Sequence, residues 1–281
     1  MLRRVLMRVY RIPATPTSPT PADLGLEAED VHLDTVDGTG LRGWFLPAPG
    51  SGTGGPAGSP AVVVLHGWGS SSADLLPAAP HLVASGLSTL LVDARGHGRS
   101  GATTFMSMPR FAEDLAAGIA WLRQDPRVDP DRIGVVGHSV GAGASLLAAS
   151  RDPRLAAVVS IGGMAHPAEL VRASRGLRRA PARLADRVLA TIEETIGHRF
   201  DSFAPVYTIT RTLAPVLVVH GTQDRTVPVR DATRLVDAGR PHARLRLVPD
   251  AGHRSVDPFL PVVGELTGFL VDALTGPARP A

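Results

Sequence analysis

A series of short apolar segments, alternating with longer amphipathic ones, constrains the fold of this chain more than any other feature. Each apolar segment has four to six residues, the length of a buried strand, and segments between them, such as 109–122 and 140–149, have helical spacing. Strands that alternate with helices indicate βαβ units, so we predict an α/β fold with a mostly parallel sheet and helices on both faces. The predicted buried strands are 61–65, 87–92, 133–136, 156–161, 216–219 and 245–248.

Two segments depart from this alternation. Residues 31–45 surround an Asp37-Gly38 pair, which is typical of a hairpin turn and predicts that the first strands are antiparallel. About 55 residues separate the strand ending at Ile161 from the next one, far more than a crossover needs. We therefore expect a helical lid inserted at about 163–213, in which the arginine-rich segment 168–196 is helix-compatible.

The N-terminus differs in composition from the rest of the chain. Residues 1–12 carry four arginines among apolar residues, and 13–21 are rich in proline, so 1–23 is expected to be a basic arm and linker before a single domain at 24–281. The arm lacks the apolar centre of a secretory signal, which favours a cytoplasmic protein. Two interpretations of the arm stay open, a weak contact with a membrane surface and a frayed terminus.

Composition excludes several classes of function. The chain has no cysteine, which rules out disulfides, thiolate zinc sites and a cysteine nucleophile. No apolar run approaches the roughly 20 residues of a membrane-spanning helix. Every basic residue is arginine and only 4% of residues are aromatic, so the high pI reflects compositional bias and not a nucleic-acid surface. No cluster has metal-ligand spacing, and we expect neither a metal nor a cofactor.

The sharpest local motif is Gly137-His138-Ser139-Val140-Gly141, between a predicted strand and a predicted helix. A Gly-x-Ser-x-Gly string is weak alone, but in this context it predicts a nucleophile elbow, where a sharp turn presents the serine at the edge of the sheet. Gly137 and Gly141 are expected because a β-carbon would clash in such a turn. Ser139 is therefore the candidate nucleophile.

A serine nucleophile needs a base and a residue that orients the base. His253 follows the last predicted strand, and Asp224 follows the strand before it, so both are expected at the same sheet edge as Ser139. Asp250, three residues before the histidine, is interpreted as a turn residue. Asp93 is interpreted as the organiser of the loop after its strand, with Arg95, His97 and Arg99 as its hydrogen-bonding companions.

Acyl transfer also requires donors for the developing oxyanion, usually two backbone N–H groups. One is expected from Val140, the residue after the nucleophile. The other is expected from Trp68, in a loop where Gly67 lets the backbone approach the site. The Trp68 ring is expected to line the pocket or to pack in the core, and the two roles are compatible. His66 is expected to brace this loop and not to act as a second base.

With these residues in place, the chain resembles the α/β-hydrolase superfamily from about Leu24 to Leu274. The opening stretch, from Asp37-Gly38 to Pro47, looks like that of bacterial BEM46-like and serine aminopeptidase-like (S33-type) hydrolases. The resemblance implies the α/β-hydrolase fold and a broad esterase-like serine hydrolase with Ser139, Asp224 and His253 as its triad. The motifs that carry it are His66-Gly67-Trp68-Gly69, Asp93-Ala94-Arg95-Gly96-His97-Gly98-Arg99-Ser100, the elbow, and the Asp224 and His253 pair.

Three functions follow from these residues. The first is a serine hydrolase that cleaves a carboxylic ester of a small acyl substrate through an acyl-enzyme. The second is a small-peptide peptidase or amidase, which would need an acidic group for the substrate amine, such as Glu193 and Glu194. The third is a non-catalytic binding module, which a broken triad would favour and the complete one does not.

Overall fold

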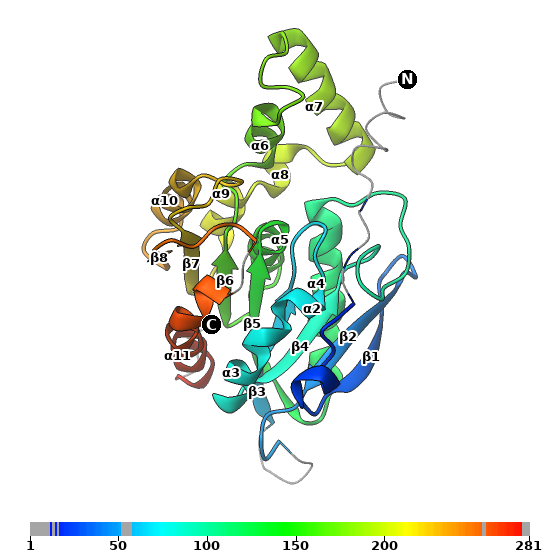
Figure 1. Ribbon diagram of the computed structural model, residues 1–281, viewed down its shortest axis with the longest axis vertical. Helices are drawn as coiled ribbons and strands as arrows, with labels where there is room; N and C mark the ends of the chain where they lie inside the picture. Colours follow the sequence, from blue (N-terminus) through cyan, green and yellow to red (C-terminus); the bar gives the residue numbers. More distant parts are fainter. Residues whose placement is uncertain (1–11, 13–14, 16, 52–57, 255–256, 277–281) are drawn as a thin grey trace.

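The computed structural model describes residues 12, 15, 17–51, 58–254 and 257–276, and its centre is an eight-stranded sheet (Figure 1). The strand order is β1-β2-β4-β3-β5-β6-β7-β8, in which β1 and β2 are antiparallel to their neighbours and the other pairs are parallel. The predicted α/β class with a mostly parallel sheet is confirmed. The strands are β1 Glu29–Asp34, β2 Gly40–Leu46, β3 Ser59–Leu65, β4 Ser88–Asp93, β5 Val128–His138, β6 Ala157–Ile161, β7 Val216–Gly221 and β8 Ala243–Val248.

The predicted hairpin joins β1 to β2. Gly38 has a φ of 78°, which suits glycine, and Asp37 accepts a hydrogen bond of 2.5 Å from the Thr35 hydroxyl inside the turn. Glu29 pairs with Phe45 and Asp34 with Gly40 across the ladder. Because β2 then pairs with β4, the hairpin forms the antiparallel side of the sheet. The parallel strands on the other side are left to position the site.

Helices cover both faces of the sheet, as predicted. Side chains of β3 alternate between two cores: Val63 packs on the side of α4, α5 and α10, and Val64 on the side of α2, α3 and α11. The helices are α2 Ser72–Leu75, α3 Ala79–Ala84, α4 Met108–Gln124, α5 Val140–Ala149, α6 Pro167–Ala173, α7 Ala182–Ile196, α8 Phe200–Phe203, α9 Pro205–Thr208, α10 Val229–Ala238 and α11 Val263–Thr275, with 3₁₀ turns η1 Ala22–Leu24, η2 Leu76–Ala78, η3 Ile209–Arg211 and η4 Asp257–Val262.

The insertion between β6 and β7 contains α6 to α9 and η3, of which α6, α7 and α8 stand beyond the carboxyl edge of the sheet (Figure 1). The helix-compatible segment 168–196 contains two helices that are not continuous, because α6 ends at Ala173 and α7 begins only at Ala182. Gly176 lies in the gap, and Pro181 sits directly before α7, where a proline that lacks an N–H can begin a helix but not continue one.

Most of the predicted N-terminal arm, 1–11, lies outside the described residues. Ile12, the last residue of the arm, packs against the core near Gly96, and Thr15 of the linker accepts a hydrogen bond of 2.5 Å from the Gly98 N–H. These contacts attach the linker to the loop after β4. Within the described part of the chain, none of the helices has the length and apolar character needed to cross a membrane.

Candidate active site

The turn between β5 and α5 holds Ser139 in a strained backbone conformation, with φ 55° and ψ −114°. A non-glycine residue at positive φ is uncommon and costs free energy. The flanking glycines are required by close packing: a Cβ on Gly137 would overlap the Gly141 carbonyl, and a Cβ on Gly141 would lie 2.5 Å from the backbone oxygens of Leu65 and His66. The two glycines of the motif therefore allow the sharp turn that lifts Ser139 to the sheet edge.

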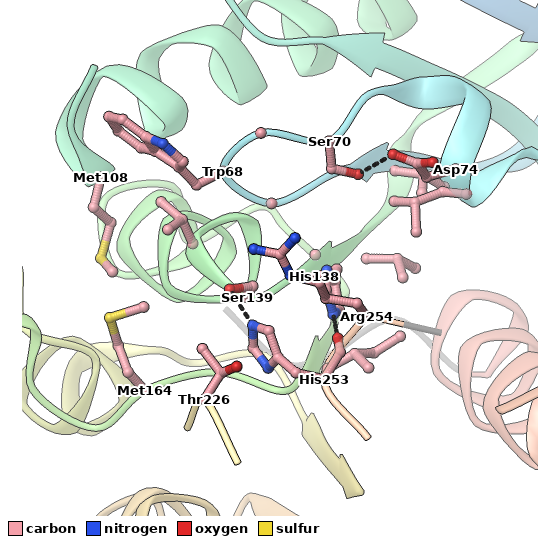
Figure 2. A pocket seen from close by; sticks show the side chains of 18 of the residues that line it. Trp68, Ser70, Asp74, Met108, His138, Ser139, Met164, Thr226, His253 and Arg254 are labelled. Atoms are coloured by element: carbon pink, nitrogen blue, oxygen red, sulfur yellow. Dashed lines mark hydrogen bonds between the residues drawn. The ribbon is translucent and has the colours of Figure 1, made fainter. Parts of the chain in front are cut away.

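Ser139, His253 and Asp224 form a continuous hydrogen-bonded chain. The distance from Ser139 Oγ to His253 Nε2 is 2.9 Å, and that from His253 Nδ1 to Asp224 Oδ2 is 2.7 Å (Figure 2). Asp224 follows β7 and His253 follows β8, so the carboxyl ends of neighbouring parallel strands bring them to the serine. Ser139 is only 8% exposed and Asp224 only 9%. The hydrogen bonds that link the three side chains are therefore shielded from water.

Asp224 is held as a carboxylate by the groups around it. Burial raises its pKa, but hydrogen bonds from His253 and from the Val227 and Thr226 N–H groups outweigh burial and keep the pKa below its ordinary value. An ionised carboxylate only accepts hydrogen bonds, so His253 Nδ1 carries the proton that it donates to Asp224. His253 Nε2 is then free to accept the hydroxyl proton of Ser139, as general-base chemistry requires.

The loop after β3 lies directly against the nucleophile. A Cβ on Gly67 would be 3.0 Å from Ser139 Cβ, so glycine allows this approach. His66 fastens the loop: its Nε2 accepts from the Ala94 N–H at 3.0 Å, and its Nδ1 is 2.8 Å from the Gly67 oxygen. Val140 is the first residue of α5, where helix N–H groups lack intrahelical partners, and the Trp68 side chain lines the cavity beside Ser139.

His138 is part of the site, although no role was predicted for it. Its Nε2 donates to the His253 carbonyl oxygen at 2.8 Å, so it ties the strand end at the elbow to the loop that carries His253. Burial lowers the pKa of His138 to about 4, with a smaller contribution from His253, which keeps it neutral at physiological pH. It occupies the first x position of the Gly-x-Ser-x-Gly motif, where any residue fits the pattern, so the motif does not indicate its role.

The interpretation of Asp93 is only partly right. Its carboxylate organises the loop by accepting the Ser72 and Arg99 N–H groups at 2.8 and 3.1 Å. Arg95 and His97 are not its companions. Both side chains point to the α4 side of the loop: Arg95 forms a buried ion pair of 2.7 Å with Asp114, and the His97 ring contacts Phe111. His97 Nδ1 bonds to the Arg95 carbonyl oxygen.

His97 makes the stability of this loop dependent on pH. Burial and the neighbouring His66 lower the pKa of His97 to about 4, whereas the unfolded chain protonates it near 6.5. The unfolded state therefore binds more protons between these values, and stability falls as pH drops from about 6.5 to 4, by as much as about 3 kcal/mol for this group. We expect His97→Asn, which retains a donor near the Nδ1 position, to reduce the fall in Tm between pH 7 and 4.5.

The matched control for this prediction is His32→Asn, because His32 is exposed on β1. Thermal unfolding of the two variants and the unmodified protein at both pH values measures the difference in slope. An equal loss of Tm in His97→Asn and the unmodified protein would contradict the role of His97.

Ser139 and His253 open into a cavity of about 640 Å³, a volume suited to a small organic molecule. The insertion roofs one side of it and α3, η4 and α11 wall the other. Glu193 and Glu194 do not line the cavity, and the Glu193 carboxylate accepts the Phe200 N–H at 2.8 Å instead. The apolar wall includes Leu170, Val171, Ile192, Ile196, Phe200 and Phe203 from the insertion, and Leu82, Leu260, Val263 and Leu266 opposite.

Carboxylates are scarce on this wall. Among the described residues that line the cavity, Asp74 is the only acidic one, and it accepts hydrogen bonds from the Ser70 hydroxyl at 2.6 Å and the Ser71 N–H at 3.1 Å. Nor do the described residues contain a group of three or more histidine, aspartate and glutamate side chains arranged to hold a metal ion. The arrangement is suited to nucleophilic chemistry by Ser139 on an apolar substrate.

Comparison with known proteins adds independent information. Residues 58–204 match the family model described as serine aminopeptidase, S33. The chain is similar to the uncharacterized protein Rv2307c of Mycobacterium tuberculosis, with 32% identity over 254 residues that cover 90% of this chain and 81% of that one. It is also similar to the thiohydrolase apmlB of Arthrinium phaeospermum, with 34% identity over 137 residues, which cover 48% of this chain and 42% of the other.

A solved structure with the same architecture is the esterase Pf2001 of Pyrococcus furiosus. The two share 25% sequence identity and a TM-score of 0.73, over 94% of this chain and 98% of the esterase. The likeness therefore extends over the whole sheet and its helices and is not limited to the elbow.

Proposed function

This chain belongs to the serine aminopeptidase S33 family of α/β hydrolases, and from that membership we propose that it is a serine hydrolase that cleaves a carboxylic ester through an acyl-enzyme. The single observation that carries the proposal is the hydrogen-bonded chain from Ser139 through His253 to Asp224 at the mouth of an apolar cavity. The esterase Pf2001 and the thiohydrolase apmlB are named for cleavage of related acyl bonds, which supports it.

In the proposed mechanism, Ser139 Oγ attacks the ester carbonyl while His253 Nε2 takes the hydroxyl proton. The oxygen of the tetrahedral intermediate accepts hydrogen bonds from the Val140 and Trp68 backbone N–H groups. His253 returns the proton to the departing alkoxide, which leaves as the alcohol and leaves the acyl group on Ser139. Water then attacks the acyl-enzyme, with His253 again as the base, and releases the carboxylic acid.

An ester is preferred over a peptide because of the cavity wall. A peptidase that recognises a free amine needs a carboxylate directed at the substrate, and the acidic candidates Glu193 and Glu194 lie away from the cavity. Asp74, which does line it, already caps α2 through Ser70 and Ser71. The apolar wall instead suits an acyl chain.

The proposal is tested with p-nitrophenyl esters from acetyl to decanoyl and with aminoacyl anilides. We expect ester turnover, with kcat/KM rising by up to about fourfold per methylene while the chain gains buried contacts. A fluorophosphonate probe should label the protein once, on the peptide that contains Ser139. Failure to label, or turnover of anilides without turnover of esters, would refute the proposal.

A further inference from the structure

Arg254 directly follows His253 and places a positive charge in the cavity of the proposed active site. It is the only arginine among the described residues that line the cavity. Its guanidinium points into the cavity on the side of Ser139, toward the loop that carries Trp68 and Ser70 (Figure 2). The side chain is exposed, so the cavity is accessible to a ligand at this point.

The charge of Arg254 has no counter-ion within the described part of the chain. Asp74, the acidic residue of the cavity wall, is engaged by Ser70 and Ser71, and Asp224 is engaged by His253, Thr226 and Val227. Some other arginines, such as Arg95, Arg127 and Arg234, are paired with carboxylates. Arg225 and Arg244, like Arg254, have no ion pair among the described residues, but they do not line the cavity. Arg254 therefore has no carboxylate partner among the described residues, and its guanidinium faces a cavity that an anionic ligand can enter.

The position of Arg254 also indicates which part of a substrate it meets. His253 Nε2 delivers the proton to the departing alcohol, so the alcohol portion lies beside His253. The Arg254 guanidinium lies on the same side of the cavity, near Ser139 and His138 (Figure 2). The apolar wall contributed by α6, α7 and α8 remains for the acyl chain. A guanidinium binds carboxylate and phosphate through paired charge-assisted hydrogen bonds.

We propose that Arg254 selects esters whose alcohol portion carries an anionic group, either a carboxylate or a phosphate. This inference rests on the proposed serine hydrolase function and names its substrate class: an amphiphilic ester with an apolar acyl chain and an anion near the scissile bond. Arg254 sets substrate preference in this scheme and takes no part in the proton transfers.

The test uses two matched pairs of octanoyl esters. The carboxylate pair is 3-(octanoyloxy)benzoate and 3-(octanoyloxy)benzamide, and the phosphate pair is 1-octanoylglycerol 3-phosphate and 1-octanoylglycerol. We expect the unmodified protein to prefer the anionic member of at least one pair by about 10- to 100-fold in kcat/KM, mostly through KM. The pair that shows the preference identifies the group. Arg254→Gln should reduce the preference to about one and leave the neutral esters within about threefold, and Arg254→Lys should restore part of it.

Arg225→Gln is the matched control, because Arg225 directly follows Asp224, is exposed and does not line the cavity. It should retain the full preference. Equal rates on anionic and neutral esters in the unmodified protein, or an equal loss on both in Arg254→Gln, would overturn the role of Arg254. Absence of hydrolysis of every ester would instead refute the proposed function itself.

Discussion

Replacing Ser139 with alanine is expected to lower kcat/KM for ester hydrolysis by about a millionfold and to abolish labelling by a fluorophosphonate. Alanine retains the Cβ and the backbone geometry of the elbow but removes the oxygen that lies 2.9 Å from His253 Nε2. Without that oxygen no acyl-enzyme forms, and only the binding of substrate and the backbone donors remain. The measurement is the rate on p-nitrophenyl octanoate together with the labelling yield.

Ser70→Ala is the matched control for this variant. Ser70 lines the same cavity, but its hydroxyl bonds to Asp74 and not to the triad candidates. We expect Ser70→Ala to keep its activity within about tenfold and to label normally, and both variants to unfold near the Tm of the unmodified protein. Residual labelling of a folded Ser139→Ala at another serine would contradict the assignment of the nucleophile.

The elbow and the sheet were predictable because both depend on local sequence. Glycine at 137 and 141 is required by contacts with backbone atoms, and such contacts leave a fixed spacing in the sequence. Parallel strands bring their carboxyl ends to one edge, so the positions of Asp224 and His253 after β7 and β8 follow from strand order. The arrangement of Ser139, Asp224 and His253 thus follows from the alternation of strands and helices and from the few residues directly after each strand.

Features that depend on distant contacts were not predictable. Arg95 meets Asp114 and Asp37, which lie 19 and 58 positions away, and nothing near Asp93 in the sequence indicates these partners. His138 bonds to a carbonyl 115 positions away. The direction of the Arg254 side chain likewise depends on how the loop after β8 folds over the cavity, so its place in the wall emerged only from the structure.

Replacing Asp224 with asparagine is expected to lower kcat/KM by about 10,000-fold with little change in Tm. The Thr226 and Val227 N–H groups both donate to Oδ1 at 2.8 Å, so they hold the asparagine oxygen in that position and turn its amide nitrogen toward His253 Nδ1. The amide then donates to Nδ1, which moves the imidazole proton to Nε2. A protonated Nε2 cannot accept the proton of Ser139. The variant therefore keeps the positions of the three side chains, but His253 is in a tautomer that cannot act as the base.

Asp250→Asn is the control for this prediction, because Asp250 is a carboxylate only three residues before His253 in the sequence. Its φ is 58°, a conformation that asparagine adopts as readily as aspartate, and its backbone N–H bond to Thr222 is unaffected by the change. We therefore expect full activity in Asp250→Asn. Both variants are compared by kcat/KM on p-nitrophenyl octanoate at pH 7.5 and by Tm. If Asp250→Asn lost activity and Asp224→Asn kept it, the carboxylate that orients His253 would be Asp250 and not Asp224.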